Sequence, residues 1–195
     1  GFPEIPVHPT AGSDRAYHYR NKMEFSFGVR WLTREELERV TAEGGTGTDA
    51  DRFALGLHIP QRFDRVLDIT ECHLQSPASA AIVNDVRAFC RERRLSIYST
   101  VTHTGYLRNL VIRESAIGER MVNLVTSEER PALLAEFSAF ILSRFADTTT
   151  IVNNITTRKS QVALGDREMV LHGPGYITDR IGKRTYRISA NSFFQ

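Results

Sequence analysis

Four cationic side chains, on two segments with the alternating pattern of β-strands, are the residues in this sequence best suited to bind an anion. In residues 19–27, Arg20 and Lys22 share the polar face of the alternation, and the other face is largely apolar. Arg108 and Arg113 bracket a second such segment, and their odd spacing places them on opposite faces. Because cationic side chains bind phosphate and arginine also stacks on bases, these residues predict a nucleic-acid surface. A solvated strand surface is the alternative.

The two cysteines, Cys72 and Cys90, indicate neither a zinc site nor a nucleophile. They are 18 residues apart and no CxxC motif accompanies them. Cys90 falls on the apolar stripe of a predicted helix, and Asp68 and Glu71 near Cys72 disfavour a thiolate there. Two cysteines form no disulfide framework, so we expect a reducing, cytoplasmic setting.

Composition describes an ordinary globular chain with an arginine bias. The chain has 195 residues, of which 41% are hydrophobic and 25% charged, with a net charge of +2. Arginine accounts for 22 of the 25 basic residues, which fits nucleic-acid binding or a GC-rich genome equally well. No apolar stretch approaches the ~18 residues of a membrane span, so no membrane partner is expected.

Capping motifs and periodicity predict the elements that position these side chains. Thr33 and Glu36 form a capping-box pattern that opens a short helix to about residue 42. Ser76 followed by Pro77 starts a helix to about residue 94, and a third runs from residues 127–131 to 145. Strands are expected at 19–27, 53–59, 65–69, 108–114, 119–127, 148–156, 169–173, 175–180 and 185–189.

The order of these elements predicts an α+β fold, a mostly antiparallel sheet with two main helices on one face. Regular βαβ alternation is missing, and the glycine-containing segments at 44–47 and 173–175 lack the strand-to-helix setting of a phosphate-binding loop. The residues alone therefore indicate an α+β domain with arginine-rich strands and no nucleotide fingerprint.

Several segments, in order, resemble the S-adenosylmethionine-dependent RNA (uracil-5-)-methyltransferases, which make 5-methyluridine. The segments are YRNKMEF at 19–25, LGLHIP at 55–60, FDRVLDI at 63–69, CHLQ at 72–75, GYLRNLVIR at 105–113, YRIS at 186–189 and SFFQ at 192–195. Together they cover nearly the whole chain, and their order and spacing are more specific than any single motif.

The resemblance implies a domain organisation in which this chain is the middle of a longer enzyme. Residues 1–15 are then a leader or linker, 16–189 a central RNA-contacting domain, and 190–195 the start of a link to a Rossmann-like methyltransferase domain. The family's nucleophilic cysteine and its glutamate base lie downstream, so no residue here is catalytic and neither Cys72 nor Cys90 is the nucleophile. The isolated chain is expected to be inactive.

The same resemblance assigns roles to three further residues. Gln195 matches a glutamine of the S-adenosylmethionine and target-base site, and Phe193 matches a neighbour that could stack on the extruded base. Cys72 matches the last of four cysteines that hold a [4Fe–4S] cluster in some members, whose other three would precede Gly1. A cluster cannot assemble in this chain alone, and its presence in the parent protein stays open.

We therefore expect a central domain that binds RNA and positions the target uridine through Arg20, Lys22, Arg108, Arg113 and Phe193. The expected partners are RNA, ribosomal in preference to transfer RNA, and the flanking domains of the same polypeptide. The alternative is a stand-alone α+β module that binds RNA or protein without a catalytic role, and a third reading is a structural spacer.

Overall fold

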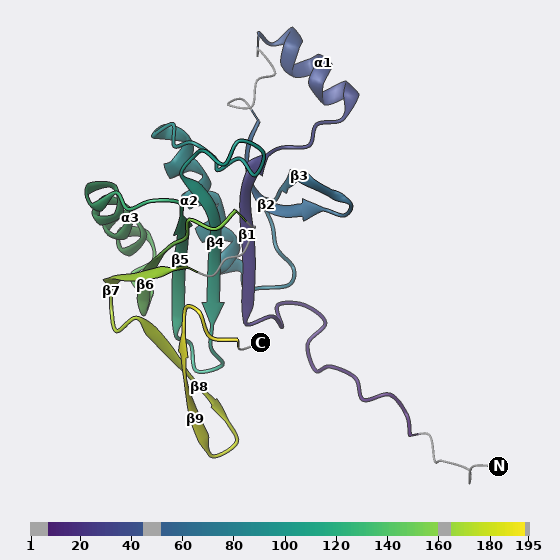
Figure 1. The fold of residues 1–195 in the computed structure, drawn as a ribbon. Helices are drawn as coiled ribbons and strands as arrows, with labels where there is room; N and C mark the ends of the chain where they lie inside the picture. The colour runs from purple at the N-terminus through teal and green to yellow at the C-terminus, as the bar shows by residue number, and fades with distance from the viewer. Residues whose placement is uncertain (1–7, 45–51, 160–164, 194–195) are drawn as a thin grey trace, which may run out of the picture.

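The structure, a computed structural model, describes residues 8–44, 52–159 and 165–193 and has the predicted α+β architecture (Figure 1). In this part of the chain, seven strands form one sheet in the order β3-β2-β1-β4-β5-β6-β7, and β8 and β9 form a separate hairpin. The strands are β1 Lys22–Val29, β2 Phe53–Ile59, β3 Arg62–Asp68, β4 Leu107–Glu114, β5 Arg120–Thr126, β6 Thr150–Ile155, β7 Arg167–His172, β8 Tyr176–Ile181 and β9 Arg184–Ser189. The helices are α1 Arg34–Ala42, α2 Pro77–Glu92 and α3 Pro131–Arg144.

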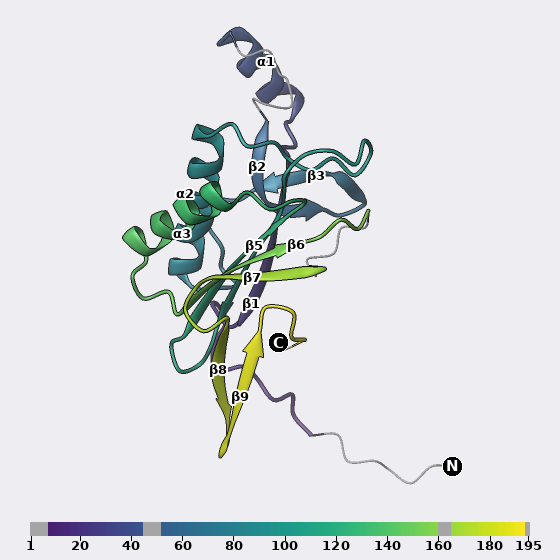
Figure 2. The same cartoon turned by 60° about the vertical axis from the view of Figure 1, so that its left-hand side comes forward.

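The large sheet is mostly antiparallel, as predicted. Among its strands in the described part of the chain, only β5 and β6 pair in parallel, and α3 makes the crossover that parallel neighbours require. α2 and α3 lie together on one face of the sheet, whereas α1 projects away from it (Figures 1 and 2). No helix within the described ranges combines the length and apolar character that crossing a membrane demands.

Helix starts follow the capping chemistry of the sequence. The Thr33 side chain accepts from the Glu36 N–H, and the Glu36 carboxylate accepts from the Thr33 N–H at 2.9 Å. At α2, the Ser76 hydroxyl accepts from the Ser79 N–H at 3.1 Å, and Pro77 occupies the first turn, where its missing N–H costs nothing. Both predicted helix starts are confirmed.

The main core lies between α2, α3 and the sheet. The predicted apolar stripe of α2 is buried there, with Ile82, Val86 and Cys90 each 0% exposed. Phe89 of α2 contacts Phe137 of α3 edge to face, with ring centroids 5.7 Å apart. This packing joins the two helices and gives the sheet its buried face.

The first strand begins later than the alternation predicts. β1 starts at Lys22, because residues 18–20 pair with a loop instead of with β4: the His18 N–H donates to the His73 carbonyl and the Arg20 N–H to the Leu74 carbonyl, each at 2.8 Å. His18 itself has a φ of +56°. The alternation within the strand is confirmed, since Phe25 and its same-face neighbours are buried.

The opposite face of the sheet carries the β8-β9 hairpin. Ile177 and Ile188 at the base of the hairpin form a small cluster with Met121 of β5 and Val152 of β6. These two sheet residues alternate with neighbours that belong to the main core, so they point away from the helices. The hairpin is therefore attached to the face that the helices leave uncovered, and its far end extends beyond the sheet (Figure 1).

Candidate nucleic-acid interface

Three of the predicted cations lie together at one end of β1 and β4. Lys22 of β1 is opposite Arg113 of β4 in the antiparallel register, and Arg20 immediately precedes the strand. Arg20 is exposed, and its Nε donates to the Lys22 carbonyl at 3.3 Å. Lys22 is half-buried, with its Nζ 3.8 Å from the Glu24 carboxylate. Arg20 is thus the most accessible of the three.

A cavity of about 520 Å³ opens beside Arg20. Arg15, His18 and Arg20 line it from the segment before β1, and Ser76 lines it from the start of α2. Among the described residues neither Arg15 nor Arg20 has an acidic partner. Arg15 and Arg20 give this wall of the cavity two cations, whereas the Glu114 carboxylate already contacts the Ser76 hydroxyl at the start of α2.

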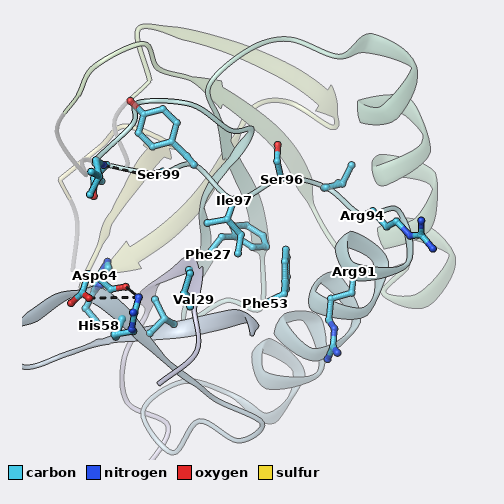
Figure 3. Close-up of a pocket in the computed structure, with 17 residues that line it drawn as sticks. Phe27, Val29, Phe53, His58, Asp64, Arg91, Arg94, Ser96, Ile97 and Ser99 are labelled. Atoms are coloured by element: carbon cyan, nitrogen blue, oxygen red, sulfur yellow. Dashed lines mark hydrogen bonds and ion pairs between the residues drawn. The ribbon is translucent and has the colours of Figure 1, made fainter. Parts of the chain in front are cut away.

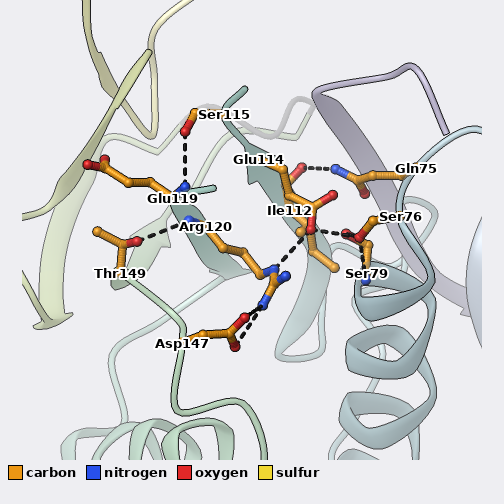
Figure 4. Close-up of polar contacts among 10 residues, drawn as sticks. All are labelled: Gln75, Ser76, Ser79, Ile112, Glu114, Ser115, Glu119, Arg120, Asp147 and Thr149. Carbon is orange, nitrogen blue, oxygen red and sulfur yellow. Dashed lines mark hydrogen bonds and ion pairs between the residues drawn. The ribbon is translucent and has the colours of Figure 1, made fainter. Parts of the chain in front are cut away.

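The opposite wall of the cavity holds a polar network that neutralises its own cation (Figure 4). Glu114 accepts from the Ser76 hydroxyl at 2.7 Å and from the Arg120 Nε at 3.0 Å. Arg120 Nη1 also donates to both carboxylate oxygens of Asp147 at 2.9 Å. Arg120 therefore has two carboxylate partners. Arg15 and Arg20, on the other side of the cavity, are the cations that remain available to a ligand.

Arg113 lies in the interior and contacts the C-terminal segment. It is 3% exposed and donates from Nη2 to the carbonyl of Ala190, at 3.3 Å, and to that of Ser192. Loss of hydration on burial lowers the pKa of its guanidinium, an effect that the nearby Glu24 carboxylate opposes. Phe193, which follows Ser192 in the chain, is 94% exposed. Arg113 holds the segment that presents Phe193, whereas Gln195 lies outside the described residues.

Arg108 lies away from the other predicted cations. It sits at a bulge in β4, where the pairing with β5 shifts between Leu107 and Asn109, and it is 4% exposed. Its guanidinium stacks over the Tyr98 ring, 4.0 Å from the centroid. Arg108 packs against Tyr98 and Arg113 against the C-terminal segment, so the structure buries both side chains for which direct RNA contacts were expected.

A larger cavity, of about 780 Å³, lies between β1, β2, β3 and residues 94–101 (Figure 3). Phe27, Phe53 and Ile97 supply apolar lining. Arg91 and Arg94 also line it, from the end of α2 and the segment after it (Figure 3). None of the predicted binding residues that the structure describes lines this space, so it is not the predicted interface.

Among the described residues, Cys72 is not grouped with other side chains that could hold a metal ion. It is 8% exposed and packs within the main core. The described ranges contain no cluster of three or more His, Cys, Asp or Glu side chains able to hold a metal ion. These residues do not provide the ligand set of an iron–sulfur cluster, which takes four thiolates.

Cys90 should resist alkylation in the folded protein. Burial raises the pKa of its thiol to about 12, although the Arg93 charge opposes this, and the thiolate is the reactive form. We expect iodoacetamide at pH 8 to modify Cys90 in the native protein at less than about one hundredth of its rate in urea. Peptide mass spectrometry, with Cys90→Ala as the control, separates it from Cys72. Similar rates in both states would contradict the burial argument.

The sequence reasoning missed the cations of the β8-β9 hairpin. Arg180, Lys183, Arg184 and Arg187 are all exposed in the structure. The available signal was the clustering of four cations within eight residues, with no acidic residue among them. Charge density along a turn, rather than alternation along a strand, is the pattern that indicates such a surface.

Comparison with known proteins finds relatives along the whole chain. An uncharacterized RNA methyltransferase of Chlorobaculum tepidum is 40% identical over 198 residues, covering 100% of this chain and 40% of that protein. One of Porphyromonas gingivalis is 36% identical over 193 residues, covering 97% of this chain and 41% of that protein. This chain thus spans about two fifths of the length of the curated relatives it matches. No family model matches it.

A solved structure has the same fold. The Pyrococcus abyssi tRNA (uracil-54, C5)-methyltransferase, crystallised with S-adenosyl-L-homocysteine, superposes with a TM-score of 0.64 at 24% sequence identity. The match covers 94% of this chain and 38% of that protein. Both comparisons therefore align this chain with a part of a longer protein.

Proposed function

We propose that this chain serves as the RNA-contacting domain of an enzyme that methylates uridine at C5, because it is related along its whole length to the RNA methyltransferases. The observation that carries the proposal is the coverage of the similarity, which includes all of this chain but only 40% of the Chlorobaculum protein. A domain of this kind binds and positions RNA, and the bond-making residues lie in the remainder of the protein.

The RNA backbone is proposed to lie along the cavity beside Arg20. Arg15 and Arg20 offer exposed guanidinium groups without acidic partners in the described part of the chain, and Lys22 adds a third cation at the same end of the sheet. Guanidinium groups bind phosphate with two parallel hydrogen bonds, which fixes the direction of the strand as well as its position. Ribosomal RNA is the proposed substrate.

Phe193 and Gln195 are proposed to reach the target uridine. Arg113 fixes the segment that ends at Phe193, and a fully exposed phenylalanine ring can stack on a base that has left its helix. S-adenosylmethionine, when bound, supplies the methyl group, and we assign to this chain only Gln195 as a contact with it. Base extrusion costs a few kcal/mol, which stacking on Phe193 partly offsets.

Substituting Arg20 or Lys22 tests the proposed backbone contacts. In the complete protein we expect Arg20→Ala or Lys22→Ala to weaken binding of a uridine-containing RNA stem-loop. Each lost phosphate contact should make the plot of log K against log[salt] less steep by about 0.7 to 0.9. Filter binding between about 50 and 200 mM salt measures both quantities.

Arg34→Ala is the matched control for this titration. Arg34 is an exposed arginine on α1, its side chain 91% exposed and paired with Glu38 one turn along the helix. Its loss should change neither affinity nor slope. A salt dependence in Arg20→Ala and Lys22→Ala equal to that of the unsubstituted protein would remove these residues from the interface.

A further inference from the structure

The β8-β9 hairpin ends in a tight, well-defined turn that projects from the body of the protein (Figure 1). Ile181 of β8 is the direct partner of Arg184 of β9, so only Gly182 and Lys183 form the loop. Gly182 has a φ of +59°, as the first central residue of a type II′ turn requires, and Lys183 does not share this conformation. A two-residue turn of this type fixes the positions of the side chains around it.

Polar contacts fix the base of the hairpin to the turn between β4 and β5. The Glu119 carboxylate accepts from both the N–H and the hydroxyl of Thr178, the latter at 2.9 Å. Asp179 accepts from the Ala116 N–H at 3.1 Å and is 6% exposed. With Ile177 and Ile188 packed on the sheet, these contacts hold the hairpin at a set angle while its far end stays in solvent.

The hairpin is strongly basic, with Arg180, Lys183 and Arg184 towards its far end and Arg187 opposite Thr178, nearer the base. Arg180, Lys183, Arg184 and Arg187 are exposed, and none has an acidic partner among the residues that the structure describes. Asp179 is the only acidic residue of the hairpin, and it is buried. Residues 176–189 thus carry a net charge of +3 in a chain whose total is +2, so the remaining residues sum to −1. The charge is concentrated on this hairpin.

Two tyrosine rings of the hairpin lie near the cations. Tyr186 is 40% exposed on β9, and the Arg187 guanidinium stacks over the Tyr176 ring at 3.8 Å. Arginine with an exposed aromatic ring is the combination that grips phosphate and stacks on unpaired bases. An acidic protein surface would satisfy the charges but leave the aromatic ring without a comparable planar partner, so RNA is the occupant that uses both.

The hairpin also adjoins the cavity that contains Arg20. Asp179 at the base of the hairpin lines the same cavity as Arg15 and Arg20, and Glu119, which holds Thr178, lines it too. An RNA strand that leaves the cavity on this side meets the hairpin next. The hairpin and Arg20 thus border one cavity, whose hairpin side is lined by the Glu119 and Asp179 carboxylates.

We propose that the β8-β9 hairpin is a second RNA-binding element, in which Arg180, Lys183 and Arg184 contact phosphates and Tyr186 stacks on an unpaired base. This inference rests on the proposed function. It extends the interface beyond the cavity, and it predicts RNA that is single-stranded or looped beside the modified uridine, because stacking on Tyr186 needs an unpaired base.

The test replaces the three cations at the tip together. Arg180→Gln, Lys183→Gln and Arg184→Gln in the complete protein should raise the Kd for a labelled RNA stem-loop about ten- to a hundredfold near 0.15 M salt. The slope of log K against log[salt] should become shallower by about 2 to 3. The control replaces three other exposed arginines with glutamine, Arg34, Arg39 and Arg91, and should change Kd less than about twofold.

Substitutions of Tyr186 separate the contribution of base stacking to RNA affinity from the contribution of charge. Tyr186→Phe should bind RNA like the unsubstituted protein, and Tyr186→Ala should bind at least about fivefold more weakly, with an unchanged salt dependence. The loss should disappear when the single-stranded part of the stem-loop is replaced by a fully paired duplex. Equal affinities of the Phe and Ala variants would overturn the stacking role.

The outcomes distinguish this inference from the proposed function. If the unsubstituted protein binds no RNA, the proposed function fails. If Arg20→Ala weakens binding while the triple variant binds normally, the hairpin proposal alone fails. If the triple variant binds RNA normally but lowers the unfolding temperature of the complete protein, the hairpin is a contact between domains, and the RNA proposal is again overturned.

Discussion

Replacing Arg113 by methionine is expected to release the C-terminal segment from the sheet without unfolding the sheet. Its guanidinium is the charged donor to the carbonyls of Ala190 and Ser192, and each hydrogen bond to a charged group contributes about 1.5 to 3 kcal/mol. Methionine fills a similar volume in this buried site without replacing either bond. The Ser192 N–H, which donates to the Ser189 carbonyl at 3.2 Å, should exchange with solvent about ten- to a hundredfold faster.

The same substitution should impair methyl transfer far more than RNA binding. In the proposed function, Arg113 positions Phe193 without touching the RNA backbone, and a misplacement of about 1 Å at a reacting centre can cost about a hundredfold in rate. We therefore expect kcat in the complete protein to fall by about that factor while the salt dependence of RNA binding is unchanged. Arg34→Met, at a side chain 91% exposed, is the control. Normal exchange at Ser192 together with normal turnover would refute the positioning role.

Local signals predicted the elements of this fold well because the chemistry that decides them is local. The Thr33 and Ser76 caps bond within three residues of themselves, so the sequence contains everything needed to locate the helix starts. The β1 strand shows the limit of such signals. Its alternation extends back to residue 19, but distant carbonyls at 73 and 74 take the backbone N–H groups of residues 18 and 20, and no local pattern records that competition.

The candidate site depended on contacts that lie far apart in the sequence. Periodicity placed Arg108 and Arg113 on a strand correctly, yet Arg108 packs against Tyr98 and Arg113 against a segment almost eighty residues further along the chain. Spacing predicted that Arg20 and Lys22 share a strand face, but β1 begins at Lys22 and the Arg20 N–H pairs with the Leu74 carbonyl, although the two cations remain close in the chain. The proximity of Arg20 to the start of α2 and to the β8-β9 hairpin required the folded chain.

Replacing Arg87 by alanine is expected to destabilise the folded protein severely. Arg87 lies on α2 and is 8% exposed, with its Nε 2.7 Å from the Asp68 carboxylate of β3. It also donates to the carbonyl of Leu55 at 3.4 Å and to that of Ile69. Burial lowers the pKa of this guanidinium, and the Asp68 charge opposes the shift. Truncation would leave a largely buried carboxylate without its cation, at a cost of about 3 to 5 kcal/mol.

Two further variants identify the cause of that loss. Arg144→Ala removes an arginine of α3 whose side chain is 54% exposed and pairs with Asp85 of α2. It should lower the free energy of unfolding by less than about 1 kcal/mol. Arg87→Met combined with Asp68→Leu removes both charges together and should recover most of the stability, since apolar replacement of a buried pair is often neutral. Urea unfolding measures all three free energies. If the double variant were as unstable as Arg87→Ala, the hydrogen bonds to the Leu55 and Ile69 carbonyls, rather than the unpaired carboxylate, would account for the loss.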